Sequence, residues 1–270
     1  MDIIITAAII KEFENHLIED EKSEATREKY LRSVRDFFGF LEGKVLSKKV
    51  VLKYKNKLVE DGYSDCSINA SLAGVNSLLG FLNAEDCRVK NMKIQKQLYL
   101  SEEKELTKSE YMKLLAAAED NKKLRMIMET ISGTGIRVSE LKYFTVEAAK
   151  LGEVHIRLKG KARVILISGK LRKKLIDYAK SEGISGGIIF RNRKGEAMDR
   201  SVIWSMMKKL CEVSGVAATK VFPHNLRKLF ARCFYKIEKD IAKLADVLGH
   251  SSIDTTRIYN DLWQRTPEDY

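Results

Sequence analysis

The chain has 270 residues, enough for two modest domains that each bury a core, and its formal net charge is +12. Residues 1–100 contain 16 Lys and Arg against 15 Asp and Glu, whereas residues 101–270 contain 33 against 22. A basic second half favours a polyanionic partner, either nucleic acid or an anionic membrane, over a role in solubility alone. The four cysteines show no paired spacing, which argues against a disulfide framework or a zinc site.

The apolar opening, residues 3–10, is too short to span a bilayer and lacks the basic region that begins a signal peptide. We therefore expect a cytoplasmic protein without a membrane anchor. Scattered cysteines are consistent with that reducing compartment.

Four helices are predicted in the first 88 residues, because apolar residues recur there at helical spacing. Their approximate ranges are 8–20, 23–41, 47–60 and 65–83. The third carries several lysines, with no acid between Glu42 and Glu60. This pattern fits a solvated surface and a surface along a phosphate backbone equally well. Residues 89–105 lose the periodicity, and we interpret them as a linker to a second domain, 106–270.

The second domain opens with a capping box, Thr107 with Glu110. A helical run over 122–132 leads into two glycines and Arg137, so a tight turn is predicted to present Arg137 at the start of the next helix. Glu140 lies three residues further on, where it can orient that guanidinium. On this motif alone, an ordinary helix joint with a surface arginine is the commoner interpretation.

A β-hairpin is predicted over 154–167, where apolar and polar residues alternate before Gly160 and an apolar run, 164–167, follows the turn. Lys159 and Lys161 lie at its tip, within reach of a substrate groove. Taken alone they are solvated turn lysines. Helices follow at about 170–181 and 199–213.

Residues 223–259 contain two histidines, several arginines and lysines, and Tyr259 as the last residue. His224 and Arg227 are three residues apart, so on a helix they share one side. Gly249 is expected to end a short helix, His250 follows it, and Tyr259 comes nine residues after His250. A phenol with a pKa near ~10 is a poor nucleophile unless its target is electrophilic and its neighbours stabilise charge. A phosphodiester held by arginines is such a target and needs no metal.

These segments, taken together, resemble the tyrosine recombinase or phage integrase family in order and spacing. The matching segments are GTGIRVSEL (133–141), KGKAR (159–163), HNLR (224–227), LGHSS (248–252) and Tyr259. The first unit is similar to that family's core-binding, SAM-like domain, so the resemblance covers nearly the whole chain. It implies a mainly α fold with a small β-hairpin, in which a helical DNA-binding domain precedes an α+β catalytic domain.

The resemblance also implies roles for particular residues. Arg137 and Arg227 would bind the scissile phosphate, and His224 would donate to the phosphate or relay the proton of the tyrosine. His250 would hydrogen-bond a non-bridging oxygen. Tyr259 would attack phosphorus to give a 3′-phosphotyrosine and a free 5′-hydroxyl.

A lysine of the hairpin would protonate the leaving 5′-oxygen, which is worth about 10²–10⁴-fold for a poor leaving group. Lys159 matches the first lysine of the family pattern. The hairpin tip is one residue shorter than common versions, so Lys161 stays an alternative.

The family resemblance implies a site-specific recombinase of a mobile element that acts on double-stranded DNA. A chromosome or plasmid resolvase or invertase with the same chemistry and a catalytically silent DNA-binding relative are the alternatives. The implied reaction uses no metal or nucleotide cofactor, and the sequence contains no phosphate-binding glycine loop. Family members dock the tail after the tyrosine on a neighbouring protomer, so a homotetramer on DNA is expected.

Overall fold

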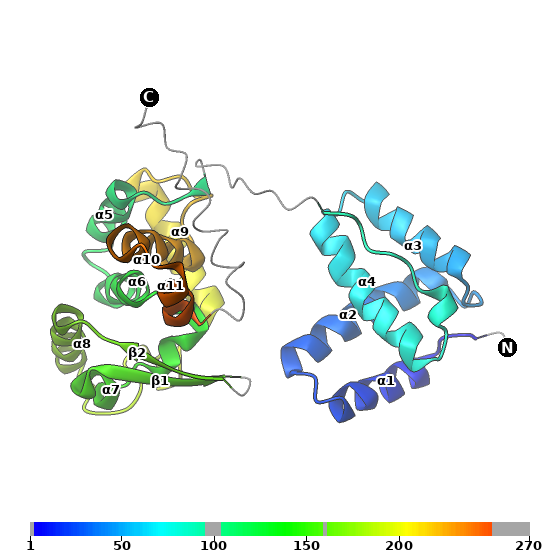
Figure 1. Cartoon of the computed structure of the whole chain (residues 1–270), viewed down its shortest axis with the longest axis horizontal. Coiled ribbons are helices and arrows are strands. Elements are labelled where there is room, and N and C mark those ends of the chain that lie inside the picture. The colour runs from blue at the N-terminus through cyan, green and yellow to red at the C-terminus, as the bar shows by residue number, and fades with distance from the viewer. Residues whose placement is uncertain (1–2, 95–103, 159–160, 250–270) are drawn as a thin grey trace. The chain divides into compact units, whose positions relative to one another are not determined.

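A computed structural model describes residues 3–94, 104–158 and 161–249, without the side chains of residues 158 and 161. The chain divides into two compact units, Met1–Lys96 and Gln97–Tyr270. Figure 1 shows the helices and strands of each unit. The boundaries expected from the sequence, at residues 88 and 105, stay predictions.

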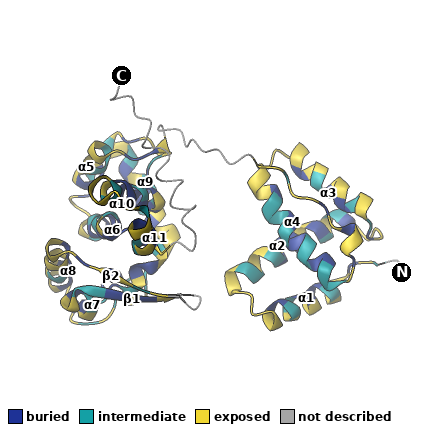
Figure 2. Cartoon of the chain, viewed as in Figure 1, coloured by how far each residue is buried: buried dark blue, intermediate teal, exposed yellow. Residues whose placement is uncertain are grey.

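The N-terminal unit is helical. Its elements are α1 (Ala7–Glu19), α2 (Glu24–Leu41), α3 (Lys48–Glu60), α4 (Asp65–Phe81) and a short 3₁₀ helix, η1 (Glu85–Cys87). Ser and Thr side chains cap three of these helices by accepting a hydrogen bond from a backbone N–H of the first turn. Apolar residues at helical spacing face inward and form one core, as Figure 2 shows for α2 and α4. The four helices expected in this region are confirmed.

The segment after η1 lies along α4 through two asparagines of that helix. Asn76 donates to the carbonyl of Val89 and accepts from its N–H, and Asn69 makes the same pair of bonds with Met92. Residues 89–92, which the sequence assigns to the linker, are therefore bonded to this unit. Sequence periodicity misses such a segment because side-chain amides, rather than a regular element, satisfy its backbone.

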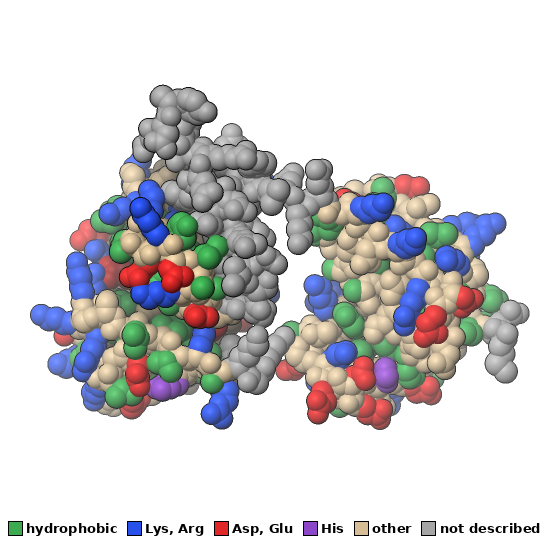
Figure 3. Space-filling view, in the orientation of Figure 1, with side chains coloured by type: hydrophobic (Ala, Val, Ile, Leu, Met, Phe, Trp, Pro, Cys, Tyr) green, Lys and Arg blue, Asp and Glu red, His purple; other side chains and the backbone are tan. Residues whose placement is uncertain are grey.

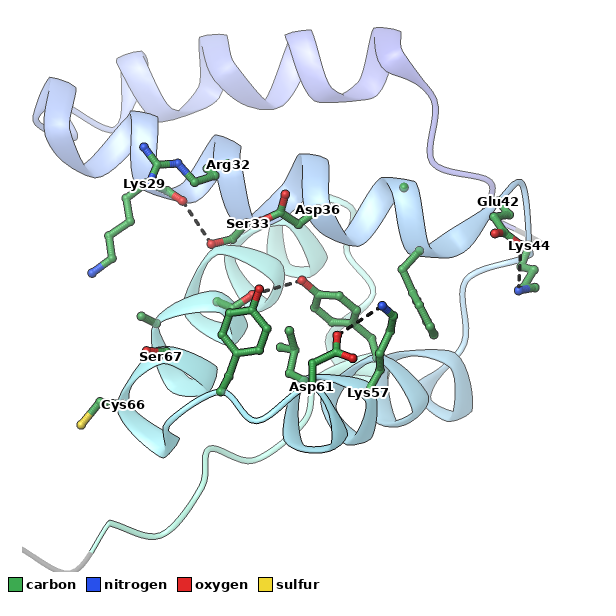
Figure 4. A pocket seen from close by; sticks show the side chains of 17 residues that line it. Lys29, Arg32, Ser33, Asp36, Glu42, Lys44, Lys57, Asp61, Cys66 and Ser67 are labelled. Carbon is green, nitrogen blue, oxygen red and sulfur yellow. Dashed lines mark hydrogen bonds and ion pairs between the residues drawn. The ribbon is translucent and has the colours of Figure 1, made fainter.

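A groove of about 910 Å³ lies between α2, α3 and α4 (Figure 4). Its walls carry charges of both signs, including Lys29, Arg32 and Lys57 against Asp36 and Asp61. Lys57 forms an ion pair with Asp61 at 3.3 Å. Basic and acidic side chains are likewise interspersed on the face of this unit in Figure 3. A mixed groove of this kind has no dominant charge to select a phosphate.

The C-terminal unit combines helices with an antiparallel hairpin. Its elements are α5 (Lys108–Ala117), α6 (Lys122–Thr134), the 3₁₀ helix η3 (Val138–Tyr143), α7 (Val146–Leu151), β1 (Glu153–Leu158), β2 (Lys161–Leu166), α8 (Gly169–Ser181), α9 (Arg200–Ser214), α10 (Pro223–Glu238) and α11 (Ile241–Leu248). The mainly α fold with a small β-hairpin is confirmed. The helix that the sequence predicts after Arg137 is the 3₁₀ helix η3.

Helix α6 is buried within this unit, where it packs against α10 and α8. Its buried residues include the apolar Leu124, Ile127, Met128 and Ile131. The contact of α6 with α10 brings the end of α6 close to the helix that carries His224 and Arg227. Among the described helices, none combines the length and apolar character needed to cross a bilayer.

Candidate functional site

The first part of the site is the turn at the end of α6. Gly135 adopts φ +67°, and its N–H donates to the carbonyl of Ile131 at 2.8 Å. A Cβ at this position would lie 2.3 Å from Cδ1 of Phe230 and 3.0 Å from Cδ2 of Leu248. Only glycine satisfies both the backbone conformation and the close packing. The turn therefore brings Arg137 beside α10 and α11.

Arg137 is held by Glu140, as its spacing predicts. The guanidinium donates from Nη1 to Oε1 of Glu140 at 3.1 Å, and the backbone N–H donates to Oε2 at 2.7 Å. Nη2 makes a longer hydrogen bond, 3.4 Å, to the carbonyl of Gly249. The Glu140 side chain is 1% exposed, whereas that of Arg137 is 45% exposed. A buried carboxylate thus orients a guanidinium that solvent, or an anion, can still reach.

Arg227 belongs to α10, which begins with Pro223 at the helix position where a missing N–H costs nothing. Its side chain is 2% exposed. Nη1 donates to the carbonyl of Gly135 at 2.6 Å, and Nη2 donates to the carbonyl of Leu248 at 2.8 Å. The guanidinium therefore joins the turn after α6 to the end of α11, two segments more than 100 residues apart in the sequence.

Arg163 on β2 is the third guanidinium of this cluster. It donates from Nη2 to Oε2 of Glu140 at 2.5 Å and from Nη1 to the carbonyl of Val247 at 2.9 Å. Burial lowers its pKa and the charge of Arg137 lowers it further, while Glu140 opposes both effects. An arginine remains protonated under these conditions. Arg137, Arg163 and Glu140 together therefore keep a net positive charge.

His224 lies in the first turn of α10 and is an exposed residue. Its pKa is lowered, first by desolvation and then by the positive charges of Lys228, Arg227 and Arg137. All four causes act in the same direction, so the imidazole is neutral at neutral pH. A neutral imidazole can accept a proton as well as donate one.

The first described residues of the C-terminal unit also contact α10. Arg232 of α10 donates to Oε2 of Glu105 at 2.5 Å and to the carbonyl of Leu106. The side-chain amide of Asn225 donates to the carbonyls of Lys104 and Lys220, both at 2.8 Å. These contacts fix α10, and with it His224 and Arg227, against the segment that enters the unit.

The structure brings together Arg137, His224 and Arg227 of the residues expected from the sequence. Lys159, His250 and Tyr259 lie outside the described residues. Lys161 begins β2, but its side chain is also outside them. Within the described ranges there is no group of three or more His, Cys, Asp or Glu residues that could bind a metal ion.

Arg163, Lys228, Arg232 and Glu105 were not expected to support the site. The strand pattern could have indicated Arg163, because this residue faces Ile156 across the hairpin, on the side where Ile156 and Ile165 are buried. A charged residue in an inward-facing strand position indicates a buried partner. The Arg232–Glu105 pair had no such signal, because its members are 127 residues apart.

Comparison with known families gives matches over both units. Residues 104–265 match the model of the phage integrase family, and residues 10–86 match that of the phage integrase N-terminal SAM-like domain. The chain belongs to the phage integrase family. The resemblance noted in the sequence is thereby confirmed.

The curated relatives of this integrase-family chain are tyrosine recombinases. It is 33% identical over 168 residues to tyrosine recombinase XerH of Campylobacter jejuni. The aligned segment covers 57% of this chain and 47% of the relative. It is also 33% identical over 180 residues to tyrosine recombinase XerA of Pyrococcus horikoshii, 64% of this chain and 60% of the relative. The chain thus spans about half to three fifths of the length of these relatives.

Solved structures share the fold over nearly the whole integrase-family chain. A lambda integrase dimer bound to a COC′ core site matches with a TM-score of 0.79 at 18% identity, covering 99% of each chain. XerH bound to a difH substrate in a pre-cleavage complex matches with a TM-score of 0.70 at 18% identity, covering 93% of this chain and 81% of that one. At these identities the likeness establishes the fold.

Proposed function

We propose that this chain is a site-specific DNA recombinase that cleaves and rejoins DNA through a 3′-phosphotyrosine intermediate on Tyr259. One observation carries the proposal: Arg137 and Arg227 converge on the adjacent carbonyls of Gly249 and Leu248, immediately before His250 in the sequence. Membership of the phage integrase family supports the assignment of these arginines to a phosphate.

The two guanidiniums would bind the non-bridging oxygens of the scissile phosphate and neutralise the charge that grows in the transition state. Their positions are set by protein contacts before any substrate binds, which reduces the reorganisation that the reaction requires. His250 would donate to a non-bridging oxygen.

In the first step the phenol oxygen of Tyr259 attacks phosphorus while the bond from phosphorus to the 5′-oxygen breaks. The neutral His224 would accept the proton of the phenol, and Lys159, or Lys161 in the alternative, would protonate the leaving 5′-oxygen. In the second step the 5′-hydroxyl of a partner strand attacks the phosphotyrosine while the bond from phosphorus to the Tyr259 oxygen breaks. The deprotonated lysine would take the proton of the hydroxyl, and His224 would return its proton to the phenolate. Each step exchanges one phosphoester bond for another, so the reaction needs no nucleotide, and the arginines would neutralise the phosphate charge in place of a metal.

The proposed substrate is the double-stranded DNA of a mobile element. A resolvase or invertase with the same chemistry is the second candidate. Joining of two separate DNA molecules would favour the first, whereas exclusive exchange between sites on one molecule would favour the second.

We further propose that four protomers assemble on DNA, with the residues after Tyr259 docking on a neighbour. A lambda integrase tetramer bound to a Holliday junction matches this chain with a TM-score of 0.78 at 20% identity. Leu262 and Trp263 give the tail apolar side chains for such a contact.

The test uses a duplex selected from a random pool by binding to the whole chain, then nicked near the cleaved phosphodiester so that religation fails. Wild type should accumulate a covalent protein–DNA adduct, and Tyr259→Phe should bind the same duplex without forming one. Tyr235→Phe serves as the control and should form the adduct. Binding without any adduct in the wild type would favour the catalytically silent alternative, and adduct formation by Tyr259→Phe would remove that residue from the role.

A further inference from the structure

The C-terminal end of α11 accepts hydrogen bonds from three arginines. The carbonyls of Val247, Leu248 and Gly249 accept, in order, from Arg163, Arg227 and Arg137. The last carbonyls of a helix have no partner within the helix and carry partial negative charge. Three guanidiniums, from β2, α10 and the turn after α6, therefore meet at one helix end.

Arg163 differs from the other two because the proposed reaction gives it no role. Its side chain is 15% exposed, and both terminal nitrogens already donate within the protein, to Glu140 and to Val247. Arg227 is engaged in the same way, but the family resemblance assigns Arg227 to the phosphate and gives no role to Arg163. Its contacts instead point to an effect on its neighbours.

The first neighbour is Glu140. Oε2 of this carboxylate accepts from Arg163 and from the backbone N–H of Arg137, and Oε1 accepts from Nη1 of Arg137. Since Glu140 is buried, removal of Arg163 leaves its charge with less compensation and its Oε2 with one donor fewer. The carboxylate would then shift, and the Arg137 guanidinium would shift with it.

The second neighbour is the turn at Gly249. This residue has φ +64°, and a Cβ there would lie 2.7 Å from Nη1 and 2.8 Å from Cδ of Arg163. Gly249 thus packs directly against the Arg163 side chain, and its carbonyl accepts from Arg137. Arg163, Glu140, Arg137 and the residues 247–249 form a closed ring of contacts.

We propose that Arg163 is a positioning residue, which binds Glu140 and the end of α11 so that the Arg137 guanidinium lies where it can bind the scissile phosphate. This inference rests on the proposed function, because it takes Arg137 as a phosphate ligand. Lysine cannot replace Arg163, since one ammonium lacks the planar fork that reaches two acceptors at once.

The test compares two duplexes of the selected sequence, one with the ordinary scissile phosphodiester and one with a methylphosphonate at that position. The methylphosphonate lacks the negative charge that Arg137 would neutralise. Arg137→Ala should therefore lose adduct formation strongly on the phosphodiester and much less on the methylphosphonate. If Arg163 acts through Arg137, Arg163→Met and Arg163→Lys should show the same asymmetry, with a loss of about 100-fold on the phosphodiester.

Arg157→Met is the matched control, because Arg157 is an exposed guanidinium on the other strand of the same hairpin. It should behave as the wild type on both duplexes. The ratio of rates on the two duplexes does not depend on the folded fraction, since both meet the same folded protein. Partial unfolding of Arg163→Met therefore leaves the ratio interpretable.

The positioning role would be overturned if the wild type forms its adduct and the Arg163 variants lose adduct formation equally on the two duplexes, or not at all. Absence of any adduct in the wild type would instead refute the proposed function itself. The two failures are thus distinct.

Discussion

The two units of the chain differ in what they bury. Among the described residues of the N-terminal unit, the only polar side chain in the buried class is that of Ser33. The described part of the C-terminal unit buries four charged side chains, Glu105, Glu140, Arg227 and Arg232. The first core is built as an apolar helical bundle, whereas the second is built partly around guanidiniums and carboxylates.

Burial of a charge costs stability unless a partner and further hydrogen bonds compensate for it. Each buried charge of the C-terminal unit has such contacts, and two of the four, Glu140 and Arg227, belong to the proposed phosphate site. The C-terminal unit therefore gives up part of the stability of an apolar core, and in exchange its guanidiniums are held in fixed directions. Preorganised donors of this kind are what phosphoryl transfer requires.

The largest effects are expected from the two phosphate arginines. Arg227→Ala and Arg137→Ala should each raise the activation free energy of cleavage by about 4 kcal/mol, because a phosphate charge is left uncompensated. Only Arg227→Ala should also lower the free energy of unfolding by about 3 kcal/mol, since it removes a buried cation and its two carbonyl contacts. Single-turnover adduct formation and chemical denaturation measure the two effects. The prediction would be contradicted if Arg137→Ala lowered the free energy of unfolding as much as Arg227→Ala does.

The next effect concerns the buried pair that joins α10 to the start of the unit. Arg232→Met should lower the free energy of unfolding by about 3 kcal/mol, because it leaves Glu105 buried without its cation. Glu105→Gln in the same chain should recover much of that loss. Denaturation of the single and double variants tests this, and a double variant less stable than Arg232→Met would contradict it.

A smaller effect is predicted for the titration of His224. Its pKa in the free protein should lie below the ordinary value of 6.5, because desolvation and the charges of Lys228, Arg227 and Arg137 disfavour the imidazolium. Lys228→Gln should raise the pKa toward that value. NMR titration of the ring measures both, and a pKa above 6.5 in the free protein would contradict the account.

The same shift has a consequence for stability. Because the pKa is lower in the folded state, the unfolded chain binds the proton first as the pH falls below about 6.5. The contribution of His224 to stability is therefore complete above that pH and is lost as the pH approaches the folded-state pKa. His224→Gln should remove this part of the acid sensitivity.

The smallest effects are expected on the surface of the N-terminal unit. Lys53→Gln on the exposed side of α3 should change the free energy of unfolding by less than about 0.5 kcal/mol. If α3 lies along a phosphate backbone, the substitution should also reduce the salt dependence of DNA binding by about one unit of slope. An unchanged slope would assign these lysines to a solvated surface.

Much of this fold could be predicted from local sequence. Apolar periodicity located the helices, and Gly135 and Gly249 marked the turns that the structure places beside Arg137. The pairing of Arg137 with Glu140 also followed from a spacing of three residues. These features depend on neighbours in the chain, which a single sequence contains.

The rest of the site depends on contacts between distant segments. Nothing near Arg232 indicates Glu105, and nothing near Arg163 indicates Val247, because folding alone brings those residues together. The burial of Arg227 was likewise hidden, since its position beside Gly135 and Leu248 follows from the packing of α10 on α6. The positions of Lys159, His250 and Tyr259 in the site stay predictions.

The proposed function requires that Tyr259 becomes covalently bound to DNA. The most direct measurement is to trap the adduct on the nicked duplex, digest it with trypsin and nuclease, and find the peptide that carries the nucleotide. We predict that the nucleotide lies on the peptide 258–265, whose only tyrosine is Tyr259, and that it is bound through its 3′-phosphate. The other DNA fragment should carry a free 5′-hydroxyl. A nucleotide on any other peptide, or bound through a 5′-phosphate, would contradict the account.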